Sequence, residues 1–221
     1  MTNRRIIETR MIGKMTVPEK PRHPVRYGSN PFSTCYTEPG ALEYLFPPGL
    51  NAAMLVERFI ENGGRGQIVA PHGSGKSTLL QTLLPLLKKR FEFVDVETLH
   101  DGCRRLGKLF WSIPSRKNRL AVIDGYEQLA LLERWRVRRM RHLLVTVHRP
   151  VRGLPVLLHD PLTADRFLQL VRRLGHAHDF SNAPAILENE AALTDLFRRH
   201  QGNARNAFFE LYDHVDGDIL S

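Results

Sequence analysis

Residues 67–80 contain the feature that most restricts what this chain can fold into. A short apolar run, Gln67 to Ala70, comes first, and a leucine-rich run typical of a buried helix begins near Thr78. Between them, residues 73–78 spell Gly-Ser-Gly-Lys-Ser-Thr. The pattern of a glycine, four free positions and Gly-Lys-Ser/Thr is met at every place but the first, where Ala70 replaces glycine. This succession of strand, glycine-rich turn and helix predicts a phosphate-binding loop.

Each residue type in this loop has a physical role in holding phosphate. Gly73 and Gly75 give the backbone the freedom to turn successive N–H groups toward an anion. Lys76 is expected to reach the β- and γ-phosphates, and Ser77 to ligate Mg²⁺ through its hydroxyl. The predicted nucleotide-binding residues are Pro71, His72, Gly73, Ser74, Gly75, Lys76, Ser77 and Thr78. The alternative is a glycine-serine turn that carries a lysine by chance.

The composition is that of a globular protein with room for one main core. Of the 221 residues, 42% are hydrophobic and 25% charged, as is ordinary for such proteins. The length suits one α/β domain with a small appendage rather than two full domains. Cys35 and Cys103 stand far apart without metal-type spacing, so the sequence indicates neither a disulfide framework nor a zinc site.

The charge of the chain bears on its partners and its location. A formal net charge of +9 suggests an anionic partner such as DNA, RNA or an acidic protein. Residues 1–30 read as an extended basic arm interrupted by prolines, and residues 134–141 form a second basic run. Either stretch can contact a partner or simply be solvated. Without a long apolar run or a secretory signal, we expect a cytoplasmic protein with no membrane partner.

Hydrophobic periodicity predicts alternating strands and helices followed by a wholly helical part. We expect helices over 51–60, 99–110 and 127–140, besides a phosphate-loop helix that Pro85 bends or ends. Strands are expected over 67–70, 91–96, 120–124, 142–148 and 154–158. From Pro161 onward, three amphipathic helices need one another to bury their apolar faces. The predicted domains are an arm over 1–30, a nucleotide-binding domain over 31–160 and a helical lid over 161–221.

A single carboxylate follows each of two apolar strands. Asp124 ends the run that starts at Leu120 and is the predicted second ligand of Mg²⁺, with Ser77. Asp95 also ends an apolar run and is the alternative ligand. Asp124 is followed by glycine, not by the glutamate that many P-loop ATPases use to activate water. Glu127 is the nearest substitute, and an ordinary first-turn glutamate is an equal alternative.

The order of these features resembles an AAA+ ATPase module, in particular the subset related to origin-recognition and STAND-type ATPases and to the helper ATPases of transposition. The resemblance covers most of the chain from Asn30 onward and is strongest over 70–78 and 120–124. It implies an α/β P-loop NTPase fold, a three-layer sandwich with a parallel five-stranded sheet of order 5-1-4-3-2. The nucleotide would then lie between this sheet and a small C-terminal helical lid.

The resemblance also implies two residues that sense the nucleotide. Thr146, at the end of the fourth strand, would be sensor 1, with His148 as the alternative. Arg205, in the tetrad Gly202-Asn203-Ala204-Arg205, would be sensor 2 and would couple the nucleotide to the lid. The connection from Thr146 to Leu154 leaves no room for the helix that presents an arginine finger. We therefore expect a monomer, or an oligomer built in another way, rather than a closed ring.

Together these features predict a slow AAA+-like ATPase that acts as a nucleotide-dependent switch on a nucleic-acid or protein partner. The predicted ligands are ATP and Mg²⁺, since no guanine-reading Asn-Lys-x-Asp tetrad is present. Two alternatives stay open: a small-molecule phosphotransferase that depends on Asp95, and a non-hydrolysing nucleotide-binding scaffold. The predicted catalytic residues are Lys76, Asp124, Glu127, Thr146 and Arg205.

Overall fold

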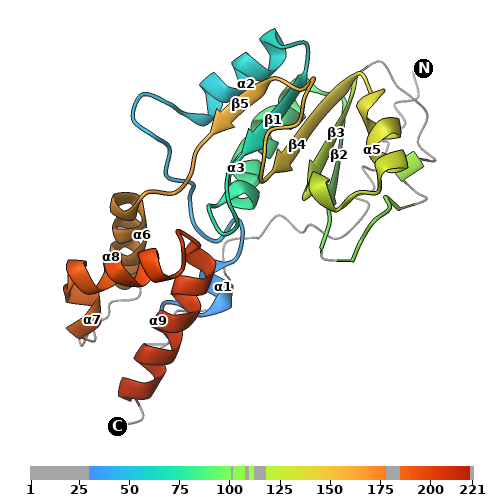
Figure 1. Cartoon of the computed structure of the whole chain (residues 1–221). Coiled ribbons are helices and arrows are strands. Elements are labelled where there is room, and N and C mark those ends of the chain that lie inside the picture. The colour runs from blue at the N-terminus through green and yellow to red at the C-terminus, as the bar shows by residue number, and fades with distance from the viewer. Residues whose placement is uncertain (1–29, 101, 108–109, 112–117, 178–184, 220–221) are drawn as a thin grey trace, which may run out of the picture.

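The computed structural model describes residues 30–100, 102–107, 110–111, 118–177 and 185–219. At its centre lies a five-stranded sheet whose neighbouring strands are all parallel, in the order β2-β3-β4-β1-β5 (Figure 1). The strands are β1 (Arg65–Val69), β2 (Phe93–Thr98), β3 (Arg119–Asp124), β4 (His142–Val147) and β5 (Val156–His159). Counted from the other edge, this is the order 5-1-4-3-2, so the predicted α/β P-loop NTPase fold is confirmed.

Two helices cover one face of the sheet, α2 (Ala52–Glu61) and α3 (Lys76–Arg90). Phe59 of α2 and Leu83 of α3 pack in one buried cluster with Ile68 and Val122 of the strands. Pro85 does not end α3, which runs through it to Arg90. The proline removes one N–H donor, but buried leucines on both sides of it hold the helix against the sheet: Leu83, Leu84 and Leu87.

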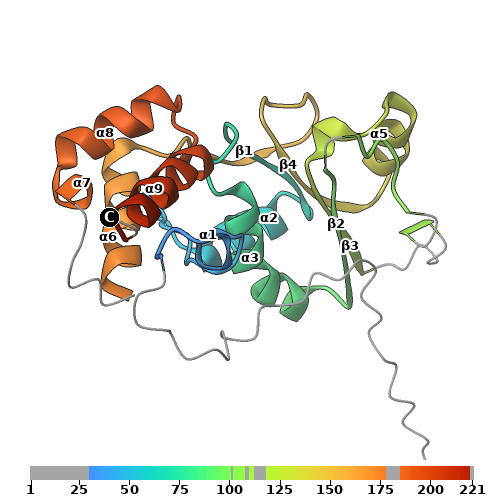
Figure 2. The same cartoon turned by 90° about the horizontal axis from the view of Figure 1, so that it is seen from below.

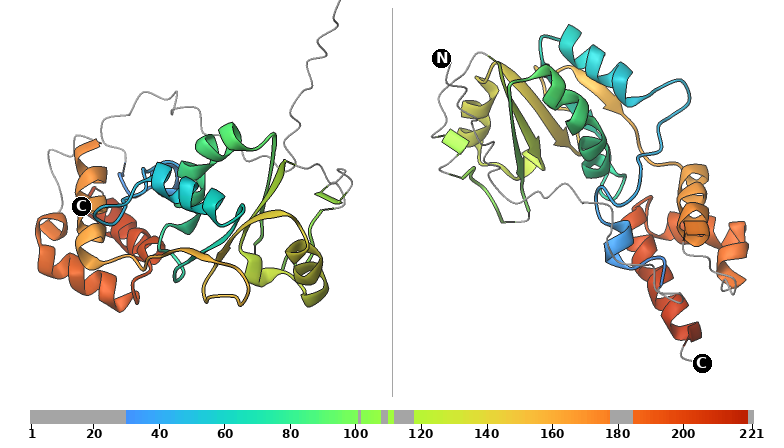
Figure 3. Two further views of the ribbon diagram at one scale, coloured as in Figure 1. Left: turned by 90° about the horizontal axis from the view of Figure 1, so that it is seen from above. Right: turned by 180° about the vertical axis from the view of Figure 1, so that it is seen from behind.

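The other face of the sheet is covered by α5 (Leu131–Arg138), the 3-10 turn η1 (Tyr126–Gln128) and described residues that follow β2 (Figure 3). The single helix expected over 127–140 is wrong, since extended backbone at Ala130 separates η1 from α5. The helix expected over 99–110 is also wrong for the described residues 99–100 and 102–107. Gly102 has a φ of +91°, which a right-handed helix does not admit. Leu99, Leu106 and Phe110 are nevertheless buried.

The remaining helices form a bundle at the carboxyl edge of the sheet (Figures 1 and 2). They are α6 (Ala164–Ala177), α7 (Ala185–Glu188), α8 (Glu190–Arg199) and α9 (Ala204–Ile219). Phe32, just before α1 (Thr34–Thr37), is buried in this bundle and stacks at 5.9 Å on Phe208. The chain before the phosphate loop therefore packs with the helices as well as with the sheet.

Residues 1–29 of the predicted basic arm lie outside the described residues, and the three-part division of the chain stays a prediction. Among the residues the structure describes, no helix is both long enough and apolar enough to cross a membrane.

Candidate functional site

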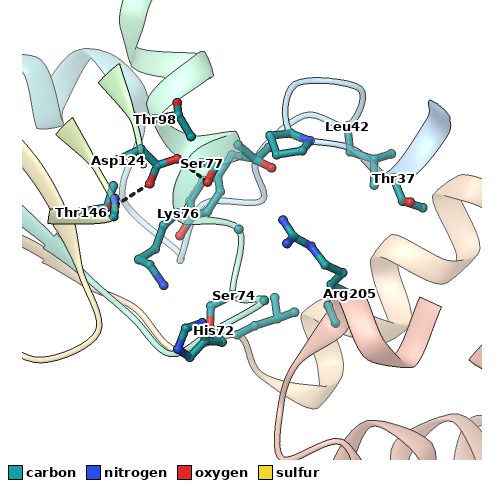
Figure 4. Close-up of a pocket in the computed structure, with 18 of the residues that line it drawn as sticks. Thr37, Leu42, His72, Ser74, Lys76, Ser77, Thr98, Asp124, Thr146 and Arg205 are labelled. Atoms are coloured by element: carbon teal, nitrogen blue, oxygen red, sulfur yellow. Dashed lines mark hydrogen bonds between the residues drawn. The ribbon is translucent and has the colours of Figure 1, made fainter. Parts of the chain in front are cut away.

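A cavity of about 690 Å³ lies between the carboxyl edge of the sheet and the helical bundle (Figure 4). One end is polar and is formed by the phosphate loop, β3 and β4. The other end is largely apolar and is formed by the segment before the loop, α6 and α9, with Leu42, Leu45, Leu162, Leu170 and Phe208. All five predicted catalytic residues line this cavity: Lys76, Asp124, Glu127, Thr146 and Arg205. Residues 72–78 also line it, whereas Pro71 is exposed and outside the lining.

The phosphate loop touches the start of α9. Gly73 has a φ of +68°, and a Cβ placed on it would lie 1.9 Å from Oδ1 of Asn203. Only glycine permits both this backbone conformation and this approach. The same Asn203 oxygen accepts a hydrogen bond from the N–H of Asn206, 3.3 Å away, and so caps the helix. The first turn of α9 is thereby held against the loop, and the Arg205 side chain extends toward the loop (Figure 4).

Asp124 is the centre of a small hydrogen-bond network at the ends of the strands. Its two carboxylate oxygens accept hydrogen bonds from the hydroxyls of Ser77, at 2.6 Å, and Thr146, at 2.5 Å (Figure 4). The Thr146 oxygen also accepts the N–H of Gly125, at 2.9 Å. Asp124 is 7% exposed and Thr146 is fully buried. Three segments that are far apart in the sequence therefore fix one carboxylate at the edge of the cavity.

Gly125 explains why no acidic residue follows Asp124 directly. Its φ is +83°, and a Cβ there would lie 2.9 Å from the carbonyl oxygen of Leu99. A glutamate at this place would be strained and would collide with backbone. Glu127, two residues later on η1, lines the cavity instead. Its Oε2 atom is buried and has no hydrogen-bond partner among the described residues.

Lys76 lies folded back on its own loop. Its ammonium group donates to the carbonyl oxygens of Ala70, at 2.7 Å, and Pro71, at 2.6 Å. Burial lowers the pKa of Lys76 below its usual value, and Arg205 lowers it further, while Glu127 and Asp124 oppose the shift. Lys76 thus lies near one other cation, Arg205, and two carboxylates at the polar end of the cavity.

His148 connects Lys76 with Glu127. Its Nδ1 atom lies 3.0 Å from Nζ of Lys76, and its Nε2 atom lies 2.5 Å from Oε1 of Glu127. Its ring also packs against that of His72 in a tilted arrangement, with 3.5 Å between the ring centres. Burial lowers the pKa of His148, and Lys76 lowers it further, although Glu127 works in the opposite direction. The lowered pKa favours the neutral form of the His148 ring.

A second polar cluster at the site was not found from the sequence. Asp160, at the end of β5, accepts two hydrogen bonds of 2.6 Å from the guanidinium of Arg166 on α6. The Tyr44 hydroxyl donates to the same carboxylate at 2.5 Å, and burial together with Asp160 raises the pKa of Tyr44. Tyr44 also lines the cavity and lies beside Gly75. No sequence spacing signals this cluster, since Tyr44 and Asp160 are 116 positions apart.

Asp95, the alternative ligand of Mg²⁺, does not line the cavity. It pairs with Ala121 in the sheet, whereas Asp124 pairs with Thr98 at the end of β2. Its carboxylate forms an ion pair with Arg119, and both side chains are largely buried. The alternative that gave Asp95 the role of metal ligand is therefore wrong, because the strand register carries it away from the phosphate loop.

The basic run 134–141 is largely engaged within the protein. Arg134 donates to the carbonyl oxygens of Glu127 and Leu129, and Arg136 pairs with Glu133 at 3.2 Å. The guanidinium of Arg139 lies 3.5 Å from the ring centre of Trp135. An anionic partner for this run stays a prediction.

The chain is similar in structure to a solved protein. Neither a scan against models of protein families nor a search of curated proteins finds a match. Among solved structures, a single-residue variant of RuvB from Thermotoga maritima aligns with a TM-score of 0.45 and 16% sequence identity. The alignment covers 72% of this chain and 58% of that one, so this chain spans less than two thirds of its length.

Proposed function

We propose that this protein is an ATPase that binds ATP and Mg²⁺ between the sheet and the helical bundle. The observation that carries the proposal is the Asp124 carboxylate, held by Ser77 and Thr146 in a cavity that Lys76 and Arg205 also line. Such a set of a lysine, a hydroxyl, a carboxylate and an arginine suits the charges of a nucleoside triphosphate. The AAA+ resemblance of the sequence agrees with this assignment.

The donor set fits Mg²⁺. A hydroxyl oxygen of Ser77 and a carboxylate oxygen of Asp124, 2.6 Å apart, are hard oxygen ligands of the kind that Mg²⁺ prefers. When bound, the ion would neutralise negative charge on the phosphates. The apolar end of the cavity would take the base and the ribose, and Arg205 would meet the phosphates from the side of the bundle.

Glu127 would act as the general base. Its free, buried Oε2 atom can accept the proton of a water molecule. The water oxygen bonds to the γ-phosphorus while the bond from that phosphorus to the β–γ bridging oxygen breaks, and ADP and phosphate leave. Because Lys76 and Arg205 contact ATP and ADP differently, the position of the bundle would follow the nucleotide, as in a switch.

The test is Mg²⁺-dependent ATP turnover and ATP binding by the full chain, with Lys76→Ala as the control. We expect turnover that needs Mg²⁺ and is abolished by chelation or by the Lys76 substitution. Binding of ATP that is equally tight in the Lys76→Ala protein would refute the proposal. Binding without turnover would instead favour the nucleotide-binding scaffold.

The same assay distinguishes a nucleic-acid partner from a protein partner. Turnover that rises on addition of duplex DNA, and rises less as salt is added, would indicate a nucleic-acid partner. Turnover indifferent to DNA would favour a protein partner. The phosphotransferase alternative loses its main support, since Asp95 is bound to Arg119 away from the cavity.

A further inference from the structure

Lys76 is held where it cannot serve the proposed function. Its ammonium group satisfies the carbonyl oxygens of Ala70 and Pro71 and meets Nδ1 of His148 at 3.0 Å. An ammonium group has three donors, and these three contacts use all of them. Lys76 must therefore give up at least one of these contacts before it can bind a phosphate.

The contacts of His148 fix which of its ring nitrogens carries the hydrogen. Lys76 can only donate, so Nδ1 accepts, and the hydrogen of the neutral ring is on Nε2. Nε2 then donates to Oε1 of Glu127, at 2.5 Å. The other tautomer would donate from Nδ1 to the carbonyl oxygen of Ala70, at the longer distance of 3.4 Å, and would turn a hydrogen toward the ammonium group. The three side chains thus form a directed chain of hydrogen bonds from Lys76 through His148 to Glu127.

We propose that His148 is a positioning residue with two duties, holding Lys76 on its own loop when the site is free and orienting Glu127 for catalysis. This inference rests on the proposed ATPase function. In both states the Nε2–H group binds Oε1 of Glu127, which leaves Oε2 available to a water molecule. Binding of ATP draws Lys76 away from Nδ1, so the lysine is released only when phosphate replaces it.

Two substitutions separate the two hydrogen bonds of His148. Asparagine places a carbonyl oxygen near the position of Nδ1 and can keep the bond from Lys76, but it cannot reach Glu127. Glutamine places an amide N–H near the position of Nε2 and can keep the bond to Glu127, but it leaves Lys76 without this acceptor. Both variants lack the imidazole ring, so a difference between them reports on the one hydrogen bond that each variant keeps.

The kinetic test compares His148→Asn and His148→Gln in the full chain. We expect His148→Asn to lower kcat by about 100-fold at unchanged KM. This is about the smallest rate enhancement that a general base usually gives, and it is lost when the base is out of position. His148→Gln should keep most of kcat and bind ATP on the order of fivefold more tightly, since one hydrogen bond no longer opposes the release of Lys76. In a Glu127→Gln background, His148→Asn should cause no further loss. Equal loss of kcat in both variants, or additive loss in that background, would overturn the proposal.

A spectroscopic test needs no turnover. Nitrogen NMR of the full chain labelled at histidine should show His148 with its hydrogen on Nε2. Its Nδ1 signal should move when Mg²⁺ and the β,γ-imido analogue of ATP are added, and the free Lys76→Ala protein should already show that move. A hydrogen on Nδ1, or an Nδ1 signal that does not depend on Lys76, would overturn the proposal. If the analogue does not bind but the signal depends on Lys76, the ATPase function falls while the chain of hydrogen bonds stands.

Discussion

At the scale of single residues, the site depends on backbone conformations that few side chains allow. Gly73 and Gly125 both have positive φ angles and both face close neighbours, Asn203 in one case and the carbonyl oxygen of Leu99 in the other. The first glycine lets the helical bundle approach the phosphate loop. The second excludes a side chain directly after Asp124 and leaves Glu127 as the nearby carboxylate without a complete set of partners.

The first prediction concerns Gly73. Gly73→Ala should destabilise the protein and weaken ATP binding, because the new methyl group meets Asn203 and because alanine at positive φ costs about 1–2 kcal/mol. Gly49→Ala is the matched control, since Gly49 has a φ of +77° but nothing within 4 Å of the added carbon. Urea unfolding and ATP titration of both variants measure the difference. Equal behaviour of the two proteins would mean that the contact with Asn203 has no effect.

At the scale of elements, one ion pair ties together three segments that enclose the cavity. Asp160 follows β5, Arg166 belongs to α6, and Tyr44 comes from the chain before the phosphate loop. The guanidinium of Arg166 also donates to the carbonyl oxygens of Leu45 and Pro161. Each ion-pair side chain is only 11% exposed, so loss of one partner would leave a charge with little water around it.

The second prediction follows from this burial. Arg166→Ala should lower the free energy of unfolding by about 3 kcal/mol, the cost of leaving a buried carboxylate without its cation. Arg172→Ala is the control on the same helix, because its ion pair with Glu190 has side chains 52% and 64% exposed. That substitution should change stability by less than about 0.5 kcal/mol. Chemical denaturation measures both values, and similar losses would contradict the role assigned to the Asp160 cluster.

At the scale of the whole molecule, the cavity is the place where the sheet and the helical bundle meet. A nucleotide bound there would contact residues of both, from the phosphate loop to Arg205. Its binding energy would therefore stabilise the arrangement of the two parts and not only the loop. This is the physical basis of the switch in the proposed function.

The third prediction tests that arrangement. Saturation with ATP and Mg²⁺ at about 100 times the dissociation constant should raise the unfolding free energy by about 2.7 kcal/mol. At the same nucleotide concentration, Arg205→Ala should show a clearly smaller rise. Arg198→Ala, on the neighbouring helix and 74% exposed, should match the unaltered protein. Urea unfolding with and without nucleotide gives these increments, and equal increments in all three proteins would argue against a nucleotide contact by Arg205.

Local spacing and apolar periodicity were enough to predict the five strands and the acid at the end of β3, and the family resemblance added the sheet order. The helix boundaries near Gly102 and Ala130 were not predicted. The positive φ of Gly102 and the extended backbone at Ala130 interrupt a helix even where the apolar spacing continues. The partners of polar side chains followed from the tertiary structure alone: Asp95 with Arg119, Tyr44 with Asp160, and His148 between Lys76 and Glu127. Such pairs join segments as much as 116 positions apart, so the packing of strands and helices, and not local sequence, sets which charges meet.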